Sequence, residues 1–174
     1  MPRPTKLKYD DFLVGAHGHD DPTAGSYAGT AYLVLGSPSV ASASLADANA
    51  QLTGESSYDA AGDSVAAAGD INADGYDDFL IGAYAYSDST SGSYAGAVYL
   101  VLGSPSVASA SLTDADARLT GESSDDYAGR SVSPAGDVNA DGYDDFLVGA
   151  YGYDDPSIGS YAGATYLLLG RGGL

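Results

Sequence analysis

The chain has 174 residues, 44% of them hydrophobic, with 24 Gly and 15 Tyr but no Trp and no Cys. Asp and Glu number 24 against 6 Lys and Arg, and the resulting formal charge of -18 excludes nucleic acid and anionic membranes as partners, because both would be repelled. The lack of Cys excludes disulfides, thiolate metal sites and cysteine nucleophiles, and no apolar run is long enough to span a bilayer.

One segment occurs three times along the chain. It reads YDDFLVGA at residues 9–16, YDDFLIGA at 76–83 and YDDFLVGA at 143–150, so the period is 67 residues. The rest of the chain repeats with the same period. Such regularity predicts an array of similar units that bury their apolar faces by stacking on one another.

Each complete repeat is predicted to form four short strands, separated by clusters of Gly, Pro, Asp and Ser. The apolar runs in the second and third strands are continuous, which is typical of strands buried on both faces. In chain order the predicted strands are 10–16, 30–35, 50–53, 64–68, 77–84, 97–102, 117–120, 131–135, 144–151 and 164–169.

Residues 107–117, with their copy at 40–50, allow two interpretations. The Ala, Ser, Leu and Asp in these segments could form a helical turn. Flanking Gly and Pro favour a loop. We expect a loop that leads into the fourth strand.

Four strands that follow one another in a meander form one blade of a β-propeller. The predicted fold is therefore all-β, a partial propeller of about two and a half to three blades per chain. The array spans 1–174, with blade 1 at 9–56 lacking its first strand, blade 2 at 60–123, and blade 3 at 127–170 lacking its last strand. Because propellers close with about four to eight blades, we expect that copies assemble or that the chain is part of a longer protein.

The loop before the second strand carries the candidate chemistry. It reads DINADGYDD at 70–78 and DVNADGYDD at 137–145. Oxygen ligands at positions 1, 3, 5 and 9, with the backbone carbonyl at position 7, can surround a hard cation, and Gly at position 6 permits the sharp turn. Ca²⁺ accepts about six to eight oxygens in flexible geometry, whereas Mg²⁺ needs a stricter octahedron. We predict two Ca²⁺ sites.

The predicted ligands are side-chain oxygens and, at the two tyrosines, carbonyl oxygens: Asp70, Asn72, Asp74, Tyr76 and Asp78, then Asp137, Asn139, Asp141, Tyr143 and Asp145. An EF-hand would require Glu at position 12, but Ile81 and Val148 stand there, inside predicted strands. The first repeat keeps only Asp11 of this set. A turn without metal is the alternative, and two identical patterns at the repeat spacing favour calcium.

The order YAG at 127–129 followed by SVxxAGDVNADGYDDFLVGA at 131–150 resembles the FG-GAP repeat. That repeat builds the propeller of integrin alpha chains and of many bacterial and archaeal surface proteins. The resemblance implies calcium held between the first two strands of a blade, and an extracellular, adhesive or ligand-binding role. The chain departs from the motif name, because the region of Ala61 or Tyr127-Ala128 stands for its Phe, and His17, Tyr84 or Tyr151 for its Pro.

Three further groups have a structural and a functional interpretation. The pair His17 and His19 could bind zinc, but tyrosines occupy the same repeat positions, so we expect no site. Acidic residues between the second and third strands either initiate turns or extend a cation site: Asp20, Asp21, Asp88, Asp154 and Asp155. Tyrosines near the same loops form either a recognition surface or blade packing: Tyr84, Tyr86, Tyr94, Tyr151, Tyr153 and Tyr161.

No catalytic triad order and no phosphate-binding loop is present in the sequence. We therefore expect a calcium-stabilised, non-catalytic module for adhesion or for protein or glycan binding. The alternative is a structural protein whose blades close into an oligomeric ring or grow into a filament, with the chain itself as partner. A carbohydrate-active enzyme is the least favoured hypothesis.

Overall fold

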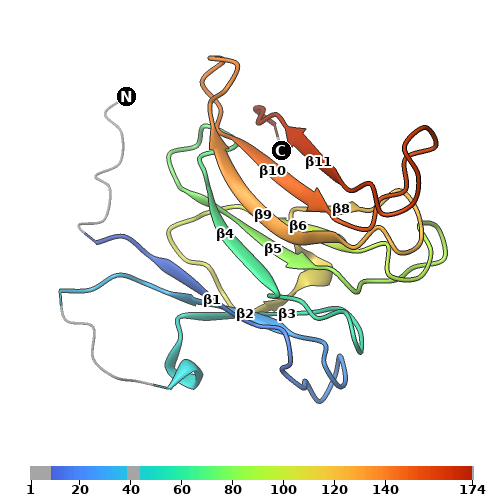
Figure 1. Ribbon diagram of the computed structural model, residues 1–174. Helices are drawn as coiled ribbons and strands as arrows, with labels where there is room; N and C mark the ends of the chain where they lie inside the picture. The colour runs from blue at the N-terminus through green and yellow to red at the C-terminus, as the bar shows by residue number, and fades with distance from the viewer. Residues whose placement is uncertain (1–8, 39–43, 174) are drawn as a thin grey trace.

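The structure, a computed structural model, describes residues 9–38 and 44–173 and is built from three sheets that lie side by side (Figure 1). The fold is all-β, and the sheets are blades of a β-propeller. Their strands are β1 (Phe12–Ala16), β2 (Thr30–Val34) and β3 (Ala50–Thr53) in blade 1, β4 (Ser64–Gly69), β5 (Asp78–Ala83), β6 (Ala97–Val101) and β8 (Ala117–Thr120) in blade 2, and β9 (Ala128–Gly136), β10 (Asp145–Ala150) and β11 (Ala164–Leu168) in blade 3.

All ten predicted strands are present, and their order within each blade is the predicted meander. Strands β3 and β8 have the predicted bounds, whereas β9 begins three residues before the predicted 131–135 and ends one after it. Consecutive strands within each blade pair antiparallel. The apolar runs therefore form the two middle strands of blade 2, β5 and β6, whereas β1 and β11 are edge strands of blades 1 and 3.

Blade 2 is buried on both faces because the side chains of β5 and β6 alternate between its two neighbours. Phe79, Ile81, Tyr99 and Val101 join the core shared with blade 1. Leu80, Val98 and Leu100 join the core shared with blade 3. The apolar run is thus continuous because the apolar side chains of β5 and β6 point into one or the other of two cores.

Neighbouring blades approach closely at one glycine, Gly15 in β1 and Gly82 in β5. A Cβ atom added to Gly82 would lie 2.0 Å from the carbonyl oxygen of Gly129 at the start of blade 3. The hydroxyl of Ser64 donates a hydrogen bond to that same carbonyl at 2.7 Å. Between blades 1 and 2, Gly15 stands in the same relation to the carbonyl oxygen of Gly62, again at 2.0 Å.

The loop expected at residues 107–117 is present and includes one short helical turn, so both interpretations of this segment apply in part. Residues Leu112–Asp114 form one 3₁₀ turn (η2), and Leu45–Asp47 form its copy (η1). Ser111 caps η2 by accepting a hydrogen bond from the Thr113 N–H at 3.2 Å. Just before this turn, β7 (Ala110–Ser111) pairs in parallel with β3 and extends blade 1. Residues 40–43 of the copy lie outside the described residues.

Among the residues that the structure describes, no helix could reach across a bilayer.

Candidate metal centre

The loop between β4 and β5 is folded by its own acidic side chains. The two carboxylate oxygens of Asp70 accept hydrogen bonds from the N–H groups of Asp74 and Gly75, both at 2.9 Å. The amide oxygen of Asn72 accepts from the same Asp74 N–H at 3.0 Å. Asp74 in turn accepts from the Tyr76 N–H at 2.9 Å. Side-chain oxygens at positions 1 and 3 of the loop therefore converge on one backbone amide.

The loop between β9 and β10 repeats this arrangement. Asp137 accepts from the N–H groups of Asp141 and Gly142 at 3.0 and 2.9 Å, and Asn139 accepts from Asp141 at 3.1 Å. Asp141 accepts from Tyr143 at 3.0 Å. Each distance differs from its counterpart in the first loop by at most 0.1 Å. The geometry is thus a property of the repeat rather than of one blade.

Positive backbone φ angles allow the loop to turn this tightly. Gly75 and Gly142 have φ of 97° and 94°, where a side chain would be strained, which explains glycine at position 6. Ala73 and Ala140 also lie in the left-handed region, at 58° and 60°. The Asp and Asn hydrogen bonds around them hold these alanines there.

The carboxylate at position 9 is buried and is held from two sides. Asp78 is fully buried and accepts from the Ile71 N–H at 2.9 Å and from the Gly103 N–H at 2.8 Å. Burial raises the pKa of Asp78 to about 6, although both N–H groups oppose the shift; the charges of Asp74 and Asp70 add to it. Asp78 thus connects the start of the loop to the end of β6.

The first repeat separates the structural role of position 9 from any role in metal binding. Asp11 still accepts from the Gly36 N–H at 2.7 Å, as Asp78 does from Gly103, although blade 1 lacks the rest of the ligand set. Asp145 keeps the same contact with Gly170 at 2.8 Å. This aspartate therefore fixes the end of the third strand in every blade, which the sequence did not reveal.

Within each loop the predicted ligands form two groups. Hydrogen bonds join positions 1, 3 and 5, whereas position 9 lies apart from them and accepts from other backbone amides. Within residues 9–38 and 44–173, no three Asp, Glu or His side chains stand together in an arrangement that could hold a metal ion. The ligand set also contains an amide and a carbonyl oxygen, and its donors are all hard oxygen atoms, which suits Ca²⁺. Positions 1 and 3 converge on the N–H of position 5 in each loop, and calcium binding there stays a prediction. Position 9 is turned toward backbone amides.

Asp144, which was not among the predicted ligands, connects the first loop to the next blade. Its carboxylate accepts from the Asp70 N–H at 2.9 Å, and its own N–H donates to the Asp70 carbonyl at 3.2 Å. The doubled aspartate of the YDDF segment is the sequence signal for this contact. Its first Asp, Asp144, is hydrogen-bonded to the neighbouring blade, whereas its second, Asp145, is hydrogen-bonded within its own blade.

The histidine pair and the acidic turn residues have structural roles. His17 lies 3.8 Å from Asp63, whereas His19 contacts Gln51 at 3.3 Å, so the two rings have different neighbours. The acidic residues between the second and third strands accept backbone hydrogen bonds within their own turns, which lowers the pKa of Asp21 and Asp88. The pKa of Asp155 is lowered first by the hydroxyl of Ser157 and then by the N–H groups of Ser157 and Ile158. Of the two interpretations, turn initiation and extension of a cation site, these contacts agree with turn initiation.

The tyrosines gather at the end of the blades opposite the acidic loops, since they follow β5 and β10 whereas the loops precede them. Tyr127 is central: its ring stacks on Tyr151 at 5.0 Å and lies 5.9 Å from Tyr94 and 6.3 Å from Tyr84. These contacts join blades 2 and 3, so blade packing is part of their role. Tyr94 and Tyr151 remain exposed.

Comparison with known proteins agrees with this architecture. The profile of the FG-GAP repeat matches residues 61–101 and 128–168, which are the first three strands of blade 2 and of blade 3. A search of curated proteins gave no match. Propeller modules made of FG-GAP repeats are generally non-catalytic and typical of extracellular or surface proteins. The chain therefore carries two segments that match the FG-GAP repeat, each with its own acidic loop.

Proposed function

We propose that the chain is a calcium-stabilised, non-catalytic propeller module that binds a protein or glycan outside the cell. The observation that carries the proposal is the pair of acidic loops with the same hydrogen bonds, 67 residues apart. Asp70, Asn72 and Asp74 with the Tyr76 carbonyl and Asp78 would hold one ion. Their copies, Asp137, Asn139, Asp141, Tyr143 and Asp145, would hold the second.

Charge supports this proposal. The chain carries a formal charge of -18, and each loop places four aspartates within nine residues. Self-repulsion of this kind destabilises a compact state unless counter-charge is bound. A divalent ion in the first loop would also act across a blade junction, because Asp70 is hydrogen-bonded to Asp144 of blade 3. Calcium would then stabilise the contact between blades as well as the loop.

Thermal unfolding in calcium, in magnesium and in chelator tests the proposal. A ligand at about 100 times its dissociation constant stabilises the folded state by about 2.7 kcal/mol per site. We expect a higher melting temperature in calcium than in chelator, a smaller effect of magnesium, and two calcium ions bound per chain by calorimetric titration. Removing one loop's ligand with Asp141→Ala should leave one ion.

Asp155→Ala is the matched control. It also removes a carboxylate that accepts backbone N–H groups, at 2.7 Å from Ser157 and 2.9 Å from Ile158, but it lies in a turn outside the acidic loops. It should lower stability equally with and without calcium. Equal melting temperatures in calcium and chelator for the unaltered chain would refute the proposal.

The ligand-binding part of the proposal assigns recognition to the tyrosine end. Tyr94, Tyr151 and Tyr161 are exposed there, and tyrosine offers a large rigid surface with a polar tip. Screening on a glycan array, followed by Tyr161→Ala, tests this assignment. We expect the substitution to remove binding without changing the melting temperature; binding unaffected by changes at all three tyrosines would contradict it.

A further inference from the structure

The two outer sheets of the array each leave one face uncovered, and the two faces are different. We define the back face of blade 3 as Leu147, Gly149, Thr165, Leu167 and Leu169, and the front face of blade 1 as Phe12, Val14 and Val34. Tyr32, which pairs with Val14 on the adjoining strand, is itself buried. The repeat relates the back face to the side of blade 2 that packs on blade 3. It relates the front face to the side of blade 2 that packs on blade 1.

Residues at the same repeat position differ in exposed fraction according to whether a neighbouring blade covers them. Leu100 is 3% exposed beneath blade 3, whereas Leu167 is 50% exposed on the back face. Phe79 is 7% exposed against blade 1, whereas Phe12 is 44% exposed on the front face. Apolar side chains in such a patch mark an interaction surface.

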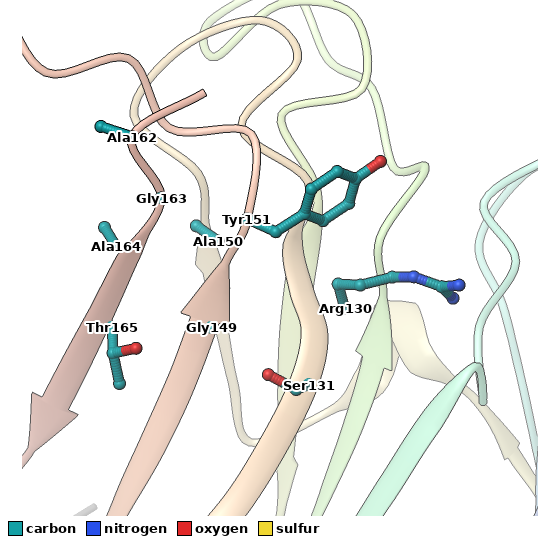
Figure 2. Close-up of a pocket in the computed structure, with 9 residues that line it drawn as sticks. All are labelled: Arg130, Ser131, Gly149, Ala150, Tyr151, Ala162, Gly163, Ala164 and Thr165. Atoms are coloured by element: carbon teal, nitrogen blue, oxygen red, sulfur yellow. The ribbon is translucent and has the colours of Figure 1, made fainter. Parts of the chain in front are cut away.

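The back face is also hollowed where a next blade would begin. Ser131, Gly149 and Thr165 lie on three neighbouring strands and line a cavity of about 410 Å³ (Figure 2). In blade 2 the corresponding Ser64 and Gly82 receive the carbonyl oxygen of Gly129. The surface of blade 3 is thus shaped to receive another blade of this repeat.

We infer that the back face of blade 3 binds the front face of blade 1 of a second copy of this chain. The two junctions inside the chain are the precedent, since each joins a back face to the front face of the following blade. The contact is heterologous, so it extends head to tail and either closes into a ring or grows into a filament. This goes beyond the calcium proposal and does not depend on it.

Charge affects the strength of this association. Each copy carries a formal charge of -18, which opposes the contact. Raising salt from about 0.1 to 1 M shortens the Debye length from about 10 to 3 Å and should therefore favour assembly.

Light scattering during size-exclusion chromatography at several protein and salt concentrations tests the inference. The unaltered chain should form oligomers whose mass rises with both concentrations. Leu167→Asp and Phe12→Asp should each be monomeric, because one carries a damaged back face and the other a damaged front face. An equimolar mixture of the two should form dimers and nothing larger, since each dimer has one intact pair of faces.

The controls separate assembly from folding. Ile158→Asp changes a 79% exposed side chain between β10 and β11, outside both faces, and should assemble normally. Thr165→Glu provides a second, milder change of the back face should Leu167→Asp not fold, with circular dichroism reporting folding of each variant. The inference is overturned if the unaltered chain stays monomeric at high salt, or if Phe12→Asp assembles normally while Leu167→Asp does not, which would indicate back-to-back pairing.

Discussion

Replacing the same glycine in two blades should have opposite effects on stability. Gly82 and Gly149 occupy one repeat position, in the near-identical segments DFLIGA and DFLVGA. A Cβ atom at Gly82 would meet the backbone carbonyl oxygen of Gly129 at 2.0 Å, and this atom belongs to the next blade. A Cβ atom at Gly149 would meet the Ser131 hydroxyl at 2.3 Å, and the next nearest atom lies 3.6 Å away.

The magnitudes follow from these neighbours. Gly82→Ala must separate blades 2 and 3, at the cost typical of overpacking, about 1–3 kcal/mol. It should also break the hydrogen bond from Ser64 to Gly129, which contributes about 1 kcal/mol. We therefore expect a loss of about 2–4 kcal/mol. At Gly149 the serine side chain can rotate away, and alanine reduces the entropy of the unfolded chain, so Gly149→Ala should stabilise by up to about 1 kcal/mol.

Urea unfolding followed by far-ultraviolet circular dichroism would measure both variants. The chain should be dilute and in low salt, so that association between copies does not contribute. Gly82→Ala should unfold at a lower urea midpoint than the unaltered chain, and Gly149→Ala at an equal or higher one. Equal losses in the two variants would show that the glycines are required within their own blades, and would refute the reasoning from the blade junction.

Two further predictions concern charged groups near the junction of blades 1 and 2. Burial raises the pKa of Asp59 to about 6 from 3.8, so its charged form destabilises the folded state above about pH 6 and this penalty disappears below about pH 4. Asp59→Asn can still accept a hydrogen bond from the Ser56 N–H. The melting temperature of this variant should exceed that of the unaltered chain near neutral pH and equal it at about pH 4. A constant difference in melting temperature across this pH range would contradict the raised pKa of Asp59. Arg118 donates to both carboxylate oxygens of Glu55 at 2.7 and 2.8 Å, but its side chain is 39% exposed, so Arg118→Gln should cost less than about 1 kcal/mol in a denaturant titration and less again in high salt.

The acidic loops illustrate how far local sequence determines local structure. Asp, Asn and Gly at fixed spacing fold the loop through hydrogen bonds that span at most five residues, and both copies do so in the same way. Strand positions were also predictable, because apolar runs between turn residues recur at the repeat spacing. The short 3₁₀ turn was one of two interpretations and was not preferred, since its signal, a capping serine before Leu112, is a single side chain.

Contacts between blades were not predictable in the same way. The parallel pairing of β7 with β3 joins residues 58 positions apart, and its two residues carry no pattern that selects a partner. Leu100 and Leu167 stand at the same repeat position, yet one is buried and the other is half exposed. The chain's own sequence determined the blade, its loops and the residues suited to face a neighbour. Only the tertiary structure decided which of those faces has a neighbour, because burial depends on what stacks against a sheet and near-identical repeats present the same side chains in every blade.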